Sequence, residues 1–313
     1  SDVYKRQRLH HDEARMPDGY RLPLRRWGDH DTSRAIALAL HGMNDYSKSF
    51  HSTGAFLAKH GISLIAYDQR GFGRTEGAGY WHGRQKMTGD LVTMSTLVKD
   101  MYPDKPLFLI GESMGGAVIL AALDAHSATS DGVILIAPAV WSRDTMPWYQ
   151  RSLLWIAAHT VPGKKLTGEG LDIQPSDNIE MLRELGRDPL VIKGTRVDAL
   201  YGIANLMDQA AEQTGTFNEP ALIMYGKHDQ IVPRAPTCKW IQSLHDIKNR
   251  HQTIVLYEDG YHMLNRDLNA DEVLADISSW IIGSVDDSSE KLMPGRNHLE
   301  SANTAVLAKF CNH

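Results

Sequence analysis

The sequence predicts an α/β protein with a mostly parallel central sheet, helices on both faces and a helical cap insertion. Short apolar runs of strand length alternate with segments of helical spacing over most of the 313 residues. This alternation is typical of a parallel sheet covered by helices. It stops over residues 141–215, where prolines separate several helical patches and no strand is clear. We therefore expect an α/β core of residues 20–140 and 216–283 that carries residues 141–215 as a cap.

The first half of the core alternates strands and helices in order. Residues 20–27 place arginines between apolar residues and predict a strand. Residues 34–41 (RAIALALH) and 62–68 (ISLIAYD) are short apolar runs, which fit buried strands. A helix is expected between them over residues 50–60. A second helix is expected over residues 87–101, where apolar residues recur at helical spacing.

Predicted strands and helices continue to alternate in the rest of the core, on both sides of the cap. Residues 107–111 predict a strand, 114–126 a helix rich in Ala and Leu, and 132–137 (GVILIA) another strand. After the cap, strands and helices alternate again, over residues 221–225, 236–244, 253–257 and 270–282.

Composition argues against several other classes of protein. The formal net charge is −5, which does not favour nucleic-acid binding. None of the 15 histidines lies in an HExxH motif, and we expect no metal site. No apolar run approaches the roughly 20 residues of a membrane span. Cys238 and Cys311 are far apart and form no CxxC pair, so the sequence predicts neither a zinc knuckle nor a disulfide framework.

The two ends of the chain give weaker signals. Residues 1–19 are expected to form an N-terminal extension, of which residues 1–7 (SDVYKRQ) look like translated adapter sequence. Residues 284–313 are polar and predict a mobile tail with one short helix near 302–310. We expect a cytoplasmic or peripheral membrane location. Secretion stays open, because the chain does not begin with Met.

A glycine-rich turn marks the expected nucleophile. Residues 111–116 read GESMGG and join a predicted strand to a predicted helix. This is the G-x-S-x-G pattern of a nucleophile elbow, in which a strained turn exposes a serine hydroxyl and small neighbours let strand and helix pass closely. Ser113 is the candidate nucleophile. The alternative is a glycine-driven turn with an idle serine.

A serine needs a base, and the base needs an acid that orients it. Behind such an elbow these partners follow in the order acid, then histidine. Asp229 comes just after the predicted strand 221–225, and His262 comes after the last predicted strand. We expect His262 to act as general base and then acid, and Asp229 to fix its tautomer. Polar neighbours that we consider less suitable are Glu258, Asp259, His228, His245 and His251.

Backbone N–H groups are expected to stabilise the oxyanion of a tetrahedral intermediate. One belongs to Met114, next to Ser113, and the other to Met43, in the loop after the strand that ends at His41. Another glycine-rich segment, residues 71–77, has the spacing G-x-G-x-x-x-G. That spacing is one residue longer than the dinucleotide-binding pattern, so we interpret it as a turn.

Five segments occur together in the order of a known family. The chain resembles the monoacylglycerol lipase and lysophospholipase branch of the α/β-hydrolase fold over residues 20–282. The segments are HGMNDYS (41–47), YDQRGFGRTEG (67–77), GESMGG (111–116), GKHDQIVP (226–233) and DGYHML (259–264).

The resemblance implies a serine hydrolase that acts on carboxylic esters without a cofactor. It carries the catalytic roles onto Ser113, Asp229 and His262, and the oxyanion donors onto Met43 and Met114. Two positions depart from the family. They are Thr75, where Ser is usual, and Glu112, where many members have His. Glu112 is expected to alter the charge beside the nucleophile.

The cap is expected to govern the substrate. Apolar residues cover more than one face of a predicted helix, and Trp148, Tyr149 and Leu153 are the candidate substrate-binding residues. The helix is either cap core, or it forms an acyl channel or a membrane-facing lid. The expected substrates are small acyl esters, monoacylglycerols or lysophospholipids, and the expected partners are a lipid surface reached through the cap and no nucleic acid. The alternatives are a short-chain carboxylesterase, an acyltransferase, a small-amide peptidase and a binding protein without activity. The oligomeric state is left open.

Overall fold

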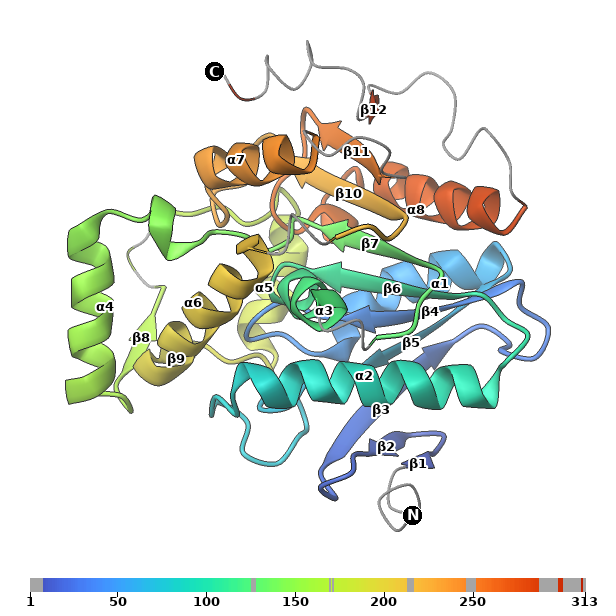
Figure 1. Cartoon of the computed structure of the whole chain (residues 1–313), viewed down its shortest axis with the longest axis horizontal. Helices are drawn as coiled ribbons and strands as arrows, with labels where there is room; N and C mark the ends of the chain where they lie inside the picture. The colour runs from blue at the N-terminus through green and yellow to red at the C-terminus, as the bar shows by residue number, and fades with distance from the viewer. Residues whose placement is uncertain are drawn as a thin grey trace.

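A twisted sheet runs through the centre of the molecule, with helices in front of it and behind it (Figure 1). This computed structural model describes residues 8–124, 128–168, 170, 172–212, 217–245, 252–286, 298–300 and 311. Among these residues the sheet has ten strands in the order β1-β2-β3-β5-β4-β6-β7-β10-β11-β12. Its parallel centre consists of β5 (Ile62–Tyr67), β4 (Ala35–Leu40), β6 (Leu107–Glu112), β7 (Gly132–Ile136), β10 (Ala221–Gly226) and β11 (Gln252–Tyr257). The fold is the mostly parallel α/β sheet that the sequence predicts.

Successive side chains of the central strands point to opposite faces of the sheet, so the core has two halves. In β6, Leu107 and Leu109 face one half, and Phe108 and Ile110 face the other. The first half is covered by α2 (Arg84–Met101), α3 (Met114–Asp124) and α7 (Arg234–His245). The second half is covered by α1 (His51–Lys59) and α8 (Ala270–Val285) (Figure 1). Because both faces are covered, the central strands are mostly apolar rather than alternately polar.

The cap follows β7 and consists of η2 (Arg143–Thr145), α4 (Trp148–Thr160), β8 (Lys165–Thr167), α5 (Ile179–Arg187), β9 (Gly194–Arg196) and α6 (Val197–Glu212). Strands β8 and β9 pair antiparallel, with Leu166 opposite Thr195. The expectation that this segment holds no strand is therefore wrong. Each strand has only three residues and neither is apolar, so no period of two could reveal them.

Both ends of the chain add strands that the sequence did not predict. β1 (Arg8–Leu9) and β2 (Glu13–Arg15) extend the sheet antiparallel beyond β3 (Arg21–Trp27). β12 (His298–Glu300) pairs antiparallel with β11, within the segment expected to be a mobile tail. Residues 1–7 and the short helix expected near 302–310 lie outside the described residues.

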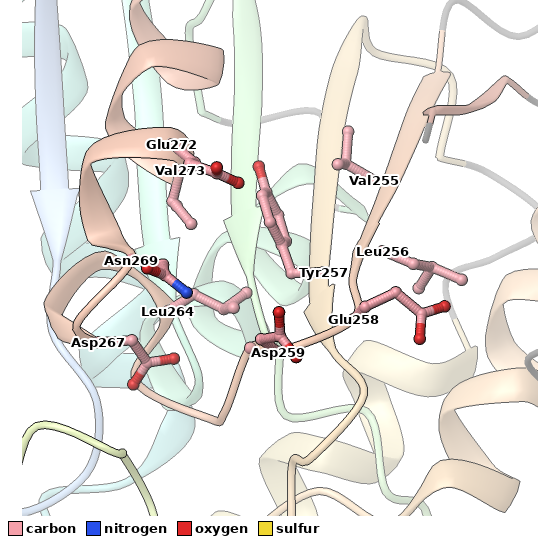
Figure 2. Close-up of a pocket in the computed structure, with 11 residues that line it drawn as sticks. Val255, Leu256, Tyr257, Glu258, Asp259, Leu264, Asp267, Asn269, Glu272 and Val273 are labelled. Carbon is pink, nitrogen blue, oxygen red and sulfur yellow. The ribbon is translucent and has the colours of Figure 1, made fainter. Parts of the chain in front are cut away.

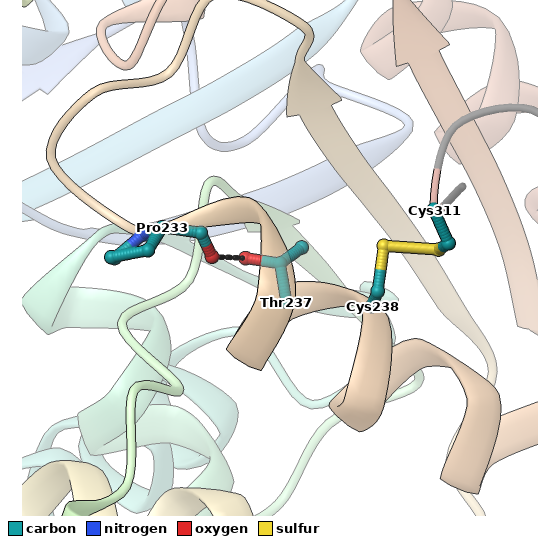
Figure 3. Close-up of a disulfide and its surroundings, with 4 residues drawn as sticks. All are labelled: Pro233, Thr237, Cys238 and Cys311. Atoms are coloured by element: carbon teal, nitrogen blue, oxygen red, sulfur yellow. Dashed lines mark hydrogen bonds between the residues drawn. A yellow bond between two sulfur atoms is a disulfide. The ribbon is translucent and has the colours of Figure 1, made fainter. Parts of the chain in front are cut away.

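A disulfide joins Cys238 of α7 to Cys311, with 5.7 Å between the two Cα atoms (Figure 3). The expectation of no disulfide is therefore wrong. The two cysteines are 73 residues apart, and such a separation carries no spacing signature. Among the described residues, no helix is both long and apolar enough to cross a membrane.

Candidate active site

Ser113 alone forms the turn between β6 and α3. Its φ angle is 52°, in the left-handed region that residues other than glycine seldom adopt. Neighbouring backbone groups hold it there. Its N–H donates to the Ile136 carbonyl at 2.9 Å, and its carbonyl accepts from the Ala139 N–H at 3.0 Å. Such a fixed and strained serine at a strand end is the geometry expected of a nucleophile elbow.

Crowding explains the three glycines around Ser113. A Cβ atom on Gly115 would lie 2.1 Å from the Leu40 carbonyl oxygen of the next strand. One on Gly111 would lie 2.5 Å from the Gly116 nitrogen, and one on Gly116 would lie 2.8 Å from Pro138 Cβ. The strand, the turn and the helix therefore approach more closely than any side chain would allow.

Asp229 and His262 are in direct contact. His262 Nδ1 lies 2.8 Å from Asp229 Oδ2, and the two side chains are only 6% and 4% exposed. The other carboxylate oxygen accepts from the N–H groups of Ile231 and Val232 at 2.8 and 3.0 Å. A carboxylate only accepts, so Nδ1 carries the proton and Nε2 is left free to accept one.

The surroundings raise the pKa of His262 above its usual value. Burial by itself lowers this pKa, but the negative charge of Asp229 and its hydrogen bond, together with the charge of Glu112, outweigh burial. Arg266 acts in the opposite direction. The imidazolium form is thus stabilised, as a base that must hold a proton during a reaction requires.

Ser113, Asp229 and His262 lie at the same edge of the sheet. They follow β6, β10 and β11, which run parallel, and only β7 stands between β6 and β10. The ligand sites of open α/β sheets lie at the carboxyl ends of the strands. Within the described residues, the Ser113 hydroxyl makes no hydrogen bond to the His262 ring. Such contacts are often loose before a substrate binds.

The two expected oxyanion donors have unused N–H groups. Within the described residues, neither the Met43 nor the Met114 N–H donates to another protein group. Met114 begins α3, where helix N–H groups are unpaired. Gly42 precedes Met43, and a Cβ atom there would lie 3.5 Å from Ser113 Cβ, so the loop passes beside the serine.

His41 fixes the direction of this loop. Its Nε2 accepts from the Gln69 N–H at 2.9 Å, so Nδ1 carries the proton, and it lies 2.8 Å from the Gly42 carbonyl oxygen. Burial lowers the pKa of His41, which keeps the ring neutral. The C=O and N–H of one trans peptide point in opposite directions, so holding the Gly42 carbonyl also directs the Met43 N–H.

A buried arginine next to these groups was missed by the sequence analysis. Arg266, the last residue of η4 (Leu264–Arg266), donates from Nη1 to Asp45 at 2.7 Å and from Nη2 to Glu112 at 2.8 Å. Burial alone would lower the pKa of Arg266, but the negative charges of Glu112 and Asp45 and their hydrogen bonds outweigh burial and raise it. The only sequence feature that could have indicated Arg266 is its charge, four positions after His262.

The polar residues considered less suitable lie elsewhere. The exposed His228 packs its ring on Tyr261, with 5.3 Å between the ring centres. Glu258 and Asp259 line a pocket of about 310 Å³ between β11 and the start of α8, together with Asp267 (Figure 2). None of the three candidate catalytic residues lines this pocket. His245 ends α7, and His251 lies outside the described residues.

Comparison with known proteins identifies the family of this chain. The family described as "Serine aminopeptidase, S33" matches residues 31–269. The chain belongs to this family. Among its relatives, a monoglyceride lipase of Rattus norvegicus is 23% identical over 88% of this chain and 92% of its own. A monoacylglycerol lipase of Mycolicibacterium smegmatis is 24% identical over 84% of this chain and 94% of its own.

A solved structure gives the same fold. A soluble variant of monoglyceride lipase from Saccharomyces cerevisiae, in complex with a substrate analog, superposes with a TM-score of 0.70. It is 22% identical and covers 85% of this chain and 93% of its own. The chain is therefore an α/β-hydrolase and a carboxylic ester hydrolase, and the resemblance and fold class that the sequence indicated are confirmed.

The S33 family match includes the whole cap, and the cap contacts the loops around Ser113. Asn44, next to Met43, donates from its amide to the Thr195 hydroxyl at 2.7 Å, and its carbonyl accepts from the Ile192 N–H at 2.9 Å. On the other side, Ser176 donates to Asp267 at 2.6 Å. The cap is thus fastened to the Met43 loop and to the loop that follows His262.

The three candidate substrate-binding residues of this S33 member lie on α4 and face solvent. Trp148 is 77% exposed, Tyr149 56% and Leu153 67%, and no residue of α4 is buried. The alternative in which these side chains form the core of the cap is therefore wrong. In Figure 1, α4 stands at the outer edge of the molecule, beside α6 and away from the sheet.

Proposed function

We propose that this protein is a serine hydrolase that cleaves carboxylic esters of fatty acyl groups, with monoacylglycerols or lysophospholipids as substrates. The reaction proceeds through an acyl-enzyme on Ser113. The observation that carries the proposal is the buried hydrogen bond between His262 and Asp229, at the sheet edge where Ser113 turns. This arrangement supports a nucleophile, a base and an orienting acid in those roles.

In the proposed acylation, Ser113 Oγ attacks the ester carbonyl carbon while His262 Nε2 takes the hydroxyl proton. Asp229 accepts the Nδ1–H hydrogen bond and stabilises the imidazolium that forms. The carbonyl oxygen becomes an oxyanion and accepts from the N–H groups of Met43 and Met114. Loss of one such donor typically costs about 10²–10³ in rate.

The acyl-enzyme then breaks down by the same steps. The tetrahedral intermediate collapses, the alcohol leaves with the proton from His262, and the acyl group stays on Ser113. Water then attacks the acyl carbonyl as His262 removes its proton. The second intermediate releases the fatty acid, and the proton returns to Ser113 Oγ. Each step uses the same base and the same two donors.

Two observations support a fatty acyl substrate. The relatives in the comparison are named monoglyceride and monoacylglycerol lipases. The outer helix α4 exposes a set of large apolar side chains, which favours contact with a lipid surface. They are Trp148, Tyr149, Leu153, Trp155 and Ile156. We therefore propose that the protein meets its substrate at a lipid surface, with α4 as the contact.

Hydrolysis of p-nitrophenyl esters from acetate to palmitate tests the proposal, with wild type compared to Ser113→Ala. We expect activity that peaks at medium or long chains and disappears in the variant, and labelling of wild type alone by a fluorophosphonate. A peak at acetate or butyrate would contradict a fatty acyl substrate and indicate a small ester instead. Cleavage of amino-acid p-nitroanilides in preference to esters would favour the peptidase alternative. Full activity of Ser113→Ala would contradict the mechanism.

A further inference from the structure

Arg266 connects three chain segments at the candidate active site. One end of its guanidinium donates to Asp45 at 2.7 Å, and the other donates to Glu112 at 2.8 Å. The side chains of Arg266, Asp45 and Glu112 are only 8%, 8% and 2% exposed. A charged group in each of three separate chain segments is therefore withdrawn from water, and the single guanidinium pairs with both carboxylates.

Each member of this set lies close in the chain to a group with a proposed role. Glu112 immediately precedes Ser113 at the end of β6. Asp45 lies two residues after Met43, in the loop that follows β4. Arg266 lies four residues after His262, and its carbonyl accepts from Asn178 of the cap at 3.0 Å.

Buried ion pairs are poor stabilisers, because the cost of removing charges from water is comparable to what their attraction returns. They do impose geometry. A guanidinium is planar and presents its donors in a fixed fork, so two carboxylates can bind it only in particular directions. Apolar side chains of similar volume would fill the same space without fixing the loops in that way.

We propose that Arg266, Glu112 and Asp45 form a positioning set that holds the Ser113 turn, the Met43 loop and the His262 loop in their reactive arrangement. The inference rests on the proposed function, because it concerns the groups to which that proposal gives roles.

The set also acts on His262 through charge, in two opposite directions. The negative charge of Glu112 raises the pKa of His262, and the positive charge of Arg266 lowers it. Removing Glu112 alone should therefore lower this pKa, and removing Arg266 alone should raise it. The charged groups that act on the pKa of His262 are Asp229 after β10, Glu112 on β6 and Arg266 in η4. Asp267 lies nearby, where it accepts from the N–H of Tyr261, the residue before His262.

The test compares kcat, KM and the acidic limb of kcat/KM for a p-nitrophenyl ester in Glu112→Gln, Arg266→Met and the double variant. We expect each single variant to lower kcat by about ten- to hundredfold, because small misplacements of catalytic groups have effects of that size. The midpoint of the acidic limb should move to lower pH in Glu112→Gln and to higher pH in Arg266→Met. In the double variant the midpoint should return toward wild type while kcat stays low.

A matched control comes from a buried arginine outside the site. Arg70 donates to Asp90 at 2.7 Å, both side chains are 5% exposed, and the pair joins the loop after β5 to α2. Arg70→Met should lose thermal stability to a similar degree and keep the wild-type midpoint. The proposal would be overturned if the Arg266 variants lose thermal stability as Arg70→Met does but keep the wild-type midpoint and the wild-type kcat. A double variant that recovers wild-type kcat would also overturn it.

Arg266→Lys keeps the proposal testable if Arg266→Met does not fold. Lysine retains the charge, so the midpoint should stay near wild type, but one ammonium does not reproduce the fork, so kcat should still fall. Wild-type kcat in Arg266→Lys would contradict the positioning role. Ser113→Ala distinguishes a failure of the proposed function from a failure of the positioning role. An active Ser113→Ala refutes the proposed function, whereas an inactive Ser113→Ala beside fully active Arg266 variants refutes only the positioning role.

Discussion

At the scale of single residues, the site depends on groups whose ionisation and direction are set by buried neighbours. His262 is held by Asp229 in the tautomer that leaves Nε2 free. His41 is held by Gln69 in the tautomer that directs the Gly42 carbonyl. Burial is the largest influence on both pKa values, and only at His262 do nearby negative charges outweigh it. The same side chain thus has opposite charge preferences at two positions in one site.

The raised pKa of His262 predicts an acidic limb of kcat/KM with a midpoint above the ordinary histidine value of about 6.5. The base must be neutral to accept the Ser113 proton, so activity should be lost as His262 becomes protonated. In Asp229→Asn the largest attractive charge is gone, and burial should then lower the pKa and move the limb to lower pH. Activity should fall by about 10⁴, as for loss of the orienting acid in other triads.

The same shift has a consequence for stability. A group whose pKa is raised in the folded state stabilises it below the unfolded pKa, and this contribution is lost as pH rises through the folded pKa. The stability difference between wild type and Asp229→Asn should therefore shrink as pH rises through that range. Rate profiles and urea unfolding at several pH values measure both effects. An acidic limb that Asp229→Asn leaves in place would show that another group titrates.

Residue positions at strand ends could be predicted from the sequence, but pairing between buried charges could not. Ser113, Asp229 and His262 each follow an apolar run, and the order of such runs fixes which edge of a parallel sheet they reach. Arg266 and Glu112 are 154 residues apart, and nothing in either segment identifies the other as its partner. The sequence indicated that Glu112 was unusual and gave no sign of what would neutralise it.

At the scale of elements, long periodic segments were predicted well and short ones were not. The central strands and their helices extend over enough residues to show a period of two or of 3.6. Strands β1, β2, β8, β9 and β12 have two or three residues each, and only their partners across the sheet define them. The helix α4 was located, but the same apolar pattern fits a buried helix and one that meets lipid.

The exposure of α4 predicts binding to lipid surfaces. Trp155 and Ile156 are exposed on this helix, and a double change to serine removes much of its apolar surface. We expect partition into phosphatidylcholine vesicles to weaken by about tenfold or more, given the value of burying large apolar side chains. Hydrolysis of dissolved p-nitrophenyl acetate should remain near wild type. Vesicle sedimentation measures the first quantity and a colour assay the second.

Met101 provides the control for this experiment, because it is exposed at the end of α2, on another part of the surface. Met101→Ser should leave vesicle binding unchanged. Equal vesicle binding by wild type and the α4 variant would show that α4 is not the lipid contact. Equal losses in the α4 variant and in Met101→Ser would indicate non-specific adsorption instead.

At the scale of the whole molecule, the sheet brings distant parts of the chain together and the cap fastens them from outside. The candidate nucleophile comes before the cap in the sequence, and the acid and the base come after it. The cap binds both the Met43 loop and the segment after His262, through Asn44 and Ser176. Arg266 makes a further connection from within. The cap therefore bridges two of the loops that lie beside the candidate catalytic groups.

The disulfide predicts a stability that depends on redox conditions. Cys238 and Cys311 close a loop with a sequence separation of 73, for which the chain-entropy account gives up to about 4 kcal/mol. Cys238→Ser should lower the melting temperature by roughly several degrees. A reductant should lower that of wild type by a similar amount and leave the variant unchanged. A wild-type melting temperature insensitive to reductant would show that the bond does not stabilise the protein.

That bond also makes residues 238–311 a closed covalent ring. His262 lies inside the ring, and Ser113 and Asp229 lie outside it. A protease that cuts one peptide bond within the ring opens it without releasing a piece. If the cut falls between Cys238 and His262, the disulfide keeps the fragment with the base attached to the fragment with the nucleophile. Nicked molecules would migrate as one band until a thiol is added and as two bands afterwards.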